Sequence, residues 1–150
     1  GKETVIDAYC GIGTISLAVA KHAKKVYGVE VVEKAIQDAK INAKLNDIHN
    51  VKFSVGKAEE KMADWQHDGL QPDVIVVDPP RKGLAPEFIT AAAEMAPKRI
   101  VYVSCNPSTL VRDVQTFMDN GYHVSQPVVP LDQFPQTPHV ESVTVLEQDK

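Results

Sequence analysis

The feature that most constrains the fold of this chain is an apolar run near its start that ends in an acid and two glycines. Residues 4–9 are rich in β-branched side chains and include Asp7, and Gly11 and Gly13 follow just before a helical pattern. This order of strand, tight turn and helix is the opening unit of an open α/β sheet. Glycines allow backbone dihedrals that a Cβ disfavours and let a ligand approach the backbone. The turn therefore predicts a binding crevice that faces the first N–H groups of the helix.

A second acid, Glu30, ends the next strand-like run. It lies roughly 20 positions after Gly11, the spacing at which a carboxylate meets a ribose in nucleotide-binding sheets. The third glycine of the dinucleotide fingerprint is missing, because Ser16 stands in its place. The pattern instead resembles that of Rossmann-like methyltransferases, which bind S-adenosylmethionine (AdoMet). We therefore expect AdoMet rather than NAD, with cofactor-binding residues at Asp7, Gly11, Gly13 and Glu30.

The composition indicates one globular domain. The 150 residues are 43% hydrophobic and 24% charged, which is ordinary for such a domain. No apolar run approaches the ~20 residues that span a membrane. The net charge of −4 argues against unaided nucleic-acid binding, because domains that bind nucleic acid alone carry a basic footprint. If RNA is the substrate, we expect most of the electrostatic attraction to come from elsewhere.

The cysteines and the start of the chain suggest where this domain belongs. Neither Cys10 nor Cys105 has a metal-ligand spacing, so we predict no metal site and a reducing, cytoplasmic location. The chain begins only a few residues before an apparent central strand. We therefore expect residues 1–150 to be one catalytic domain of a longer protein.

The remaining pattern predicts a mostly parallel, seven-stranded α/β sheet with an antiparallel edge strand and helices on both faces. Strands are expected after the first at residues 25–30, 51–55, 73–77, 99–104, 122–129 and 142–146. Helices are expected from 14 to about 25, over 32–45, from about 56 through Trp65, over 86–95, and to about 118 with Ser108 as the cap. The proline-rich residues 130–138 are expected to form a loop.

The segment after the third strand has two readings. In AdoMet-binding folds this segment borders the adenine, which makes Ala58 and Glu59 candidate cofactor contacts. Alternatively, Glu59 and Glu60 are acids placed in the first turn of a helix because the helix dipole favours them there. The sequence favours neither reading over the other.

Two further residues stand at the carboxyl ends of apolar strands, where ligands bind in open α/β sheets. Asp78 precedes two prolines that stiffen the following loop, although a rigid turn with an incidental acid is the alternative. Cys105 comes just before a helix, whose dipole and free N–H groups favour a thiolate, although a lone cysteine is more often structural. Cys10, within the glycine turn, is interpreted as small packing filler.

Residues 78–81, 104–113 and 139–143 resemble the motifs of RNA uracil-C5 methyltransferases, the bacterial 23S rRNA and tRNA 5-methyluridine enzymes. The resemblance covers essentially the whole chain. It implies that Cys105 is the nucleophile, Glu141 the base, Asp78 a contact to uracil or cofactor, and Glu30 the ribose ligand, with 23S rRNA favoured over tRNA. Members of the family carry an upstream RNA-binding β-barrel and a central glutamine-containing cofactor contact, both absent from this sequence.

The implied chemistry explains the residue types. Uracil C5 is a weak nucleophile until a thiolate adds to C6, and a base must later remove the C5 proton. One cysteine and one carboxylate suffice, with no metal and no cofactor besides AdoMet. The alternatives are an amino-group N-methyltransferase, which usually has an aromatic where this chain has Arg81, and a non-catalytic AdoMet-binding scaffold.

Glu141 has the strongest structural alternative among these residues. A glutamate that opens an edge strand is usually a solvated surface residue. The prolines before it can fold the chain back over the strand ends, and the mechanism needs a base besides the thiolate. His139 is its close competitor, and the resemblance selects Glu141.

Overall fold

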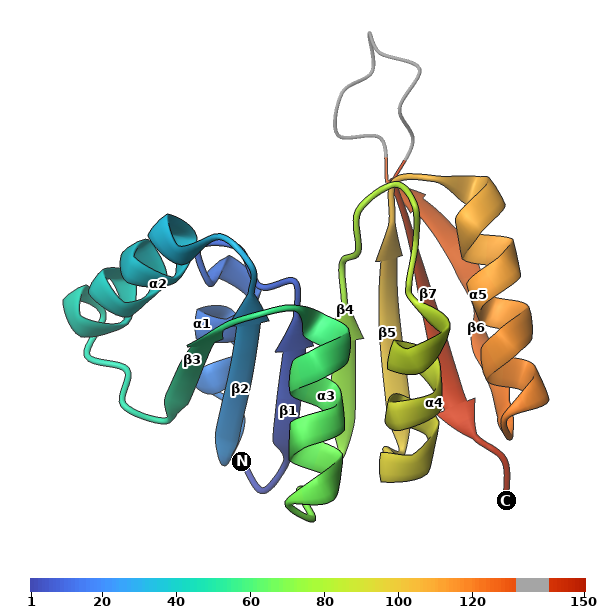
Figure 1. The fold of residues 1–150 in the computed structure, drawn as a ribbon, viewed down its shortest axis with the longest axis horizontal. Helices are drawn as coiled ribbons and strands as arrows, with labels where there is room; N and C mark the ends of the chain where they lie inside the picture. Colours follow the sequence, from blue (N-terminus) through green and yellow to red (C-terminus); the bar gives the residue numbers. More distant parts are fainter. Residues whose placement is uncertain (132–140) are drawn as a thin grey trace, which may run out of the picture.

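A computed structural model describes residues 1–131 and 141–150, with side chains described for 1–126 and 141–150. Its strands form one sheet in the order β3-β2-β1-β4-β5-β7-β6 (Figure 1). The strands are β1 (Thr4–Ala8), β2 (Lys25–Glu30), β3 (Val51–Val55), β4 (Val74–Val77), β5 (Arg99–Ser104), β6 (Tyr122–Leu131) and β7 (Glu141–Gln148). The helices are α1 (Thr14–Ala20), α2 (Glu33–Leu45), α3 (Ala58–His67), α4 (Pro86–Met95) and α5 (Pro107–Asp119).

The predicted α/β architecture is confirmed, with one difference in strand order. Strands β1 to β5 pair in parallel, and β7 runs antiparallel to both of its neighbours, β5 and β6. The reversed strand therefore lies one position inside the edge, and β6 forms the edge itself. After β5, helix α5 leads the chain to β6, which leaves one strand position free between β5 and β6. Strand β7 then fills that position. Its backbone groups gain partners on both sides as a result.

Helices cover both faces of the sheet, as the sequence predicts. Residues that alternate along each strand point to opposite faces. On one face, Ile6, Ile75 and Ile100 pack in a core cluster with Phe88 of α4 and Phe117 of α5. On the other face, the strands pack against α1 and α2, and α1 lies behind the sheet in Figure 1. Among the described residues, no helix combines the length and apolar character needed to cross a membrane.

The first helix is shorter than predicted. It ends at Ala20 instead of continuing to about residue 25. The Asn50 side chain donates hydrogen bonds to the carbonyls of Ala20 and Ala23, at 2.8 and 3.0 Å, and so satisfies groups at the end of the helix. The backbone N–H of Lys24 already bonds to Glu3, beside β1. A partner 30 positions away in sequence therefore ends this helix.

The start of α5 also differs from the prediction. Asn106, not Ser108, is the N-cap residue, and its side-chain oxygen accepts a hydrogen bond from the Ser108 N–H at 3.0 Å. Pro107 then occupies the first helical position, where its missing N–H costs nothing. The cap therefore lies directly beside Cys105.

Candidate active site

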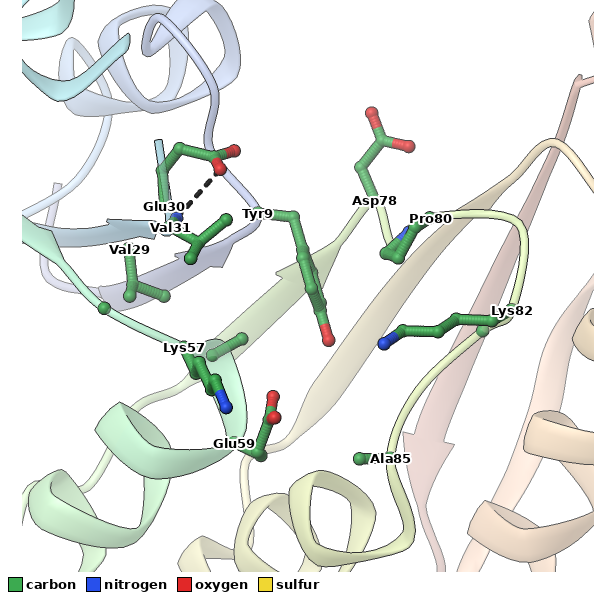
Figure 2. A pocket seen from close by; sticks show the side chains of 13 residues that line it. Tyr9, Val29, Glu30, Val31, Lys57, Glu59, Asp78, Pro80, Lys82 and Ala85 are labelled. Atoms are coloured by element: carbon green, nitrogen blue, oxygen red, sulfur yellow. Dashed lines mark hydrogen bonds between the residues drawn. The ribbon is translucent and has the colours of Figure 1, made fainter. Parts of the chain in front are cut away.

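The carboxyl ends of the parallel strands surround a cavity of about 460 Å³. Its walls come from the ends of β1 and β2, the start of α3 and the loop after β4 (Figure 2). Four of the candidate site residues named from the sequence line it: Glu30, Ala58, Glu59 and Asp78. The cavity therefore lies where ligands bind in open α/β sheets.

Backbone amides hold the Glu30 carboxylate in place. One of its oxygens accepts a hydrogen bond from the Gly11 N–H at 3.1 Å. The other accepts from the N–H groups of Val31 and Val32, at 2.8 and 3.1 Å. A carboxylate has about four acceptor positions, so an oriented acceptor remains for a ligand hydroxyl. Gly11 thus acts on the site through Glu30 and does not itself line the cavity.

Gly13 lies behind the cavity wall, against the core. Its φ is +86°, and a Cβ built there would lie 2.9 Å from the Phe53 ring. A Cβ built at Gly28 would lie 2.8 Å from the same ring and 3.1 Å from the sulfur of Cys10. Cys10 is buried, and burial, followed by the charges of nearby acids, raises the pKa of its thiol to about 12. These contacts support a packing role for Cys10.

Asp7 is buried below the glycine turn and does not line the cavity. One of its oxygens accepts a hydrogen bond from the Ser16 hydroxyl at 2.6 Å, which ties β1 to α1. The other has no hydrogen-bond partner among residues 1–131 and 141–150. Burial, offset in part by Ser16 and reinforced by the charge of Asp78, raises the pKa of Asp7 to about 6. Ser16, which stands at the position of the third glycine of the dinucleotide fingerprint, thus donates a hydrogen bond to this buried acid.

The structure adds a residue to the site that the sequence reasoning missed. Tyr9 lines the cavity with a backbone φ of +63°, in the left-handed region that non-glycine residues rarely adopt. Its ring packs on Phe88 with centroids 6.1 Å apart, and Figure 2 shows its hydroxyl between the α3 side and Lys82. Burial and the charge of Glu59 raise its pKa to about 12, so the hydroxyl stays protonated. The sequence signal that could have identified Tyr9 as a site residue is its position between Asp7 and the glycine turn.

The predicted nucleophile and base lie at the same end of two paired strands, β5 and β7. The antiparallel register of β5 and β7 pairs Ser104 with Ser142. Cys105 follows Ser104, and Glu141 precedes Ser142 as the first residue of β7, so the two residues lie one position beyond this last pair. Both are half-buried. Burial, and then the negative charge of Glu141, raises the pKa of Asp78, so Asp78 lies within electrostatic range of Glu141.

Three residues named in the sequence analysis lie outside the described part of the chain. His139 and the prolines at 135 and 138 belong to residues 132–140, outside the described residues. Within residues 1–131 and 141–150, no three histidine, cysteine or acidic side chains are grouped in a way that could hold a metal ion.

Comparison with known proteins places this arrangement in a family. The model of the family described as tRNA (uracil-5-)-methyltransferase matches residues 1–149. The chain belongs to this family. An uncharacterized RNA methyltransferase of Lactiplantibacillus plantarum is 67% identical over the whole chain, and one of Lactobacillus johnsonii is 62% identical over 97% of it. The chain spans about one third of the length of these curated relatives, 33% and 32% respectively.

Solved structures agree with the family assignment. The tRNA (uracil-54, C5)-methyltransferase of Pyrococcus abyssi, solved with S-adenosyl-L-homocysteine, is 36% identical with a TM-score of 0.82. That match covers 97% of this chain and 34% of the archaeal one. An rRNA methylase of Streptococcus thermophilus has a TM-score of 0.78 at 15% identity, over 99% of this chain and 88% of that one. At that identity the likeness concerns the Rossmann-like methyltransferase fold alone.

Proposed function

We propose that this chain is the AdoMet-binding catalytic domain of an RNA uracil-C5 methyltransferase that acts through a covalent cysteine–uracil adduct. The observation that carries the proposal is the β5–β7 register, which puts Cys105 and Glu141 one position beyond the Ser104–Ser142 pair, while Asp78 lines the cavity and lies within electrostatic range of Glu141. Family membership and the archaeal neighbour solved with S-adenosylhomocysteine support the cofactor assignment.

The cavity suits AdoMet in size and polarity. About 460 Å³ lies within the range of small-molecule sites, roughly 300–1,000 Å³. The remaining acceptor position of the oriented Glu30 carboxylate would accept a hydrogen bond from a ribose hydroxyl. Ala58 at the start of α3 would border the adenine, and Asp78 and Tyr9 also line the cavity. When bound, AdoMet supplies an electrophilic methyl group on a sulfonium.

The residues at the strand ends divide the chemistry between them. The Cys105 thiolate attacks C6 of the uracil, and the ring becomes an enolate with carbanion character at C5. C5 then forms its bond to the methyl group while the carbon–sulfur bond to that methyl breaks. Glu141 removes the C5 proton, and the electrons of the C–H bond expel Cys105 from C6. Asp78 would hold the uracil or the cofactor between these steps.

The substrate would be a uridine that is splayed out of its RNA structure, as base-modifying enzymes require. The sequence motifs favour 23S rRNA, whereas the archaeal neighbour is named for tRNA, so both RNAs belong in any test. With a net charge of −4, this domain would need another part of the protein to supply the basic RNA-binding surface. The reaction would take place in the cytoplasm, where both RNAs are found.

Covalent capture on 5-fluorouridine RNA tests the proposal in a protein of the relatives' length that carries this chain. Fluorine at C5 prevents loss of a proton, so the adduct should accumulate with AdoMet present. Cys105→Ala should abolish both capture and methyl transfer while leaving AdoMet binding nearly unchanged, and the matched Cys10→Ala variant should retain measurable activity. Methylation of uridine by Cys105→Ala would rule out the covalent mechanism. Capture would also fail with an N-methyltransferase or a scaffold protein.

A further inference from the structure

The N-terminal half of α5 holds the loop after β4 through its side chains. Arg81 lies in this loop, and its carbonyl accepts hydrogen bonds from the Asn106 amide at 3.0 Å and from the Thr109 hydroxyl at 3.1 Å. Asn106 is the residue after Cys105 in sequence. The loop that follows the candidate nucleophile is thus fastened directly to the loop that follows Asp78.

A second set of bonds lies one turn further along the helix. The Arg112 guanidinium donates to the carbonyl of Lys82 at 2.8 Å, and its Nε donates to the Asp113 carboxylate at 3.1 Å. The other oxygen of Asp113 accepts from the Leu84 N–H at 2.9 Å and from the Tyr102 hydroxyl at 2.6 Å. We call the N-cap residue Asn106 and the helix residues Thr109, Arg112 and Asp113 the α5 clamp.

The clamp is tightly built. Asp113 is 1% exposed, and a buried carboxylate is unfavourable unless hydrogen bonds compensate for the lost water. Here the described contacts give it three donors. The loop passes so close that a Cβ on Gly83 would lie 2.5 Å from an Arg112 nitrogen and 2.6 Å from an Asp113 oxygen. The backbone at Gly83 also has a φ of +79°, which favours glycine.

The segment that the clamp holds forms a wall of the cavity. Pro80, Lys82, Gly83 and Ala85 all line it. Figure 2 shows Lys82 and Ala85 on the side opposite Lys57 and Glu59. One end of α5 therefore fixes a wall of the proposed cofactor site and, at its first residues, the segment that presents Cys105.

We infer that Arg112 and Asp113 are positioning residues that couple the cofactor cavity to Cys105. The inference rests on the proposed function, because it takes the cavity as the AdoMet site and Cys105 as the nucleophile. Neither residue lines the cavity itself. They act by holding the backbone of residues 82–84 against α5, so that the wall and the cysteine loop keep one relative position.

The chain offers a matched pair for separating this role from simple stabilisation. Tyr102 and Tyr122 are both buried, and each donates one buried hydrogen bond from its hydroxyl. The Tyr102 bond goes to Asp113 of the clamp, whereas the Tyr122 bond goes to the carbonyl of Pro97, before β5. Changing either tyrosine to phenylalanine removes a similar bond, and only one of the two bonds touches the clamp.

The experiment compares Tyr102→Phe, Tyr122→Phe and Asp113→Asn in this chain. For each we would measure the Tm, the affinity for S-adenosylhomocysteine by calorimetry, and the iodoacetamide alkylation rate of Cys105 by peptide mass spectrometry. We expect similar Tm losses for the two phenylalanine variants. Tyr102→Phe should nevertheless weaken ligand binding severalfold and Asp113→Asn roughly tenfold. Both should alkylate faster at Cys105, because a loosened loop exposes the half-buried thiol, while Tyr122→Phe should match the wild type in both respects.

Three results would count against the inference or against its premise, and they are distinguishable. Equal behaviour of Tyr102→Phe and Tyr122→Phe in binding and in alkylation would overturn the clamp, even if Asp113→Asn failed to fold. Wild-type affinity and alkylation in a folded Asp113→Asn variant would overturn it as well. If the wild-type chain did not bind S-adenosylhomocysteine, the proposed cofactor site would fail, and the alkylation rates would still decide the clamp.

Discussion

The two halves of the candidate site are held in place by different kinds of bond. In the half formed by β1 and β2, backbone N–H groups of the glycine turn and the next loop orient Glu30. In the half formed by β4, β5 and β7, side chains of α5 fasten one loop to another across 25 to 30 positions of sequence. Backbone bonds of a turn tolerate many side chains, whereas a side-chain network fails with one substitution. The two halves should therefore respond differently to mutation.

The largest effect is expected from removal of the acceptor in the backbone-held half. Glu30→Ala should weaken binding of S-adenosylhomocysteine about tenfold to a hundredfold, because the ribose hydroxyls lose a charged acceptor. Calorimetry measures the change, with Glu33→Ala on the neighbouring helix as the control. The alkylation rate of Cys105 should stay the same, since Glu30 does not touch the clamp. Unchanged affinity in Glu30→Ala would remove this residue from the site.

The next largest effect is a loss of folding stability, expected from a substitution at Gly28. A Cβ there would lie 2.8 Å from Phe53 and 3.1 Å from the Cys10 sulfur, within the packing behind the glycine turn. Gly28→Ala should lower the free energy of unfolding by about 2–3 kcal/mol, as overpacking does. Urea denaturation measures this loss, and adding Phe53→Leu should recover part of it. A fully stable Gly28→Ala variant would show that the turn has room to move.

Asp7 belongs to β1, in the backbone-held half, and should make stability depend on pH. Its pKa of about 6 in the folded chain is above that of an unfolded aspartate, so the folded state binds more protons between about pH 4 and 6. The contribution of Asp7 to stability is therefore lost as the pH rises through this window. Asp7→Asn keeps an acceptor for Ser16 and should stabilise the chain at pH 7.5 by about 2 kcal/mol relative to its effect at pH 4.

The control for Asp7 is the exposed Asp64. Asp64→Asn removes an acid that is not buried, and urea titrations of this variant at pH 4 and pH 7.5 give the baseline for Asp7→Asn. If Asp7→Asn behaved in the same way, the buried carboxyl would not be protonated in the window, and its surroundings would have to be more polar than the structure indicates.

The smallest effect is expected at the cap of α5. Asn106→Ala removes the cap bond to Ser108 and the tie to Arg81, and should cost about 1 kcal/mol of unfolding free energy. Ser108→Ala should cost less than about 0.5 kcal/mol, because the described contacts give its side chain no capping role. Thermal denaturation of the two variants separates them. The reverse order would restore the sequence-based assignment of Ser108 as the cap.

The same contrast explains what the sequence could and could not predict. The strands, the position of Glu30 at the turn and the alignment of Cys105 with a strand end are local patterns, and local patterns can be read along the chain. The end of α1 depends on Asn50, 30 positions away, and the role of Asp113 depends on a loop residue 29 positions away. Contacts of that kind leave no periodic signal.

Two further features escaped the sequence for physical reasons. The left-handed backbone of Tyr9 arises from the turn as a whole, and tyrosine has no intrinsic preference for it. Either β6 or β7 could pair with β5, and the structure has β7 there. The hydrophobic pattern of the sequence is the same for both strand orders. The placement of Glu141 and Cys105 at the same end of paired strands follows from the position of β7 beside β5.

The most direct test of the central claim asks whether Glu141 acts after Cys105 has added to the uracil. It uses Glu141→Gln in a protein of the relatives' length that carries this chain, with RNA substrate and AdoMet labelled in the methyl group. Glu147→Gln is the matched control, since Glu147 lies on the same strand and pairs with Arg99 at its far end. We predict that Glu141→Gln accumulates a denaturation-resistant protein–RNA adduct that already carries the methyl label, with little free product. Normal turnover by Glu141→Gln, or loss of activity without any adduct, would contradict the account.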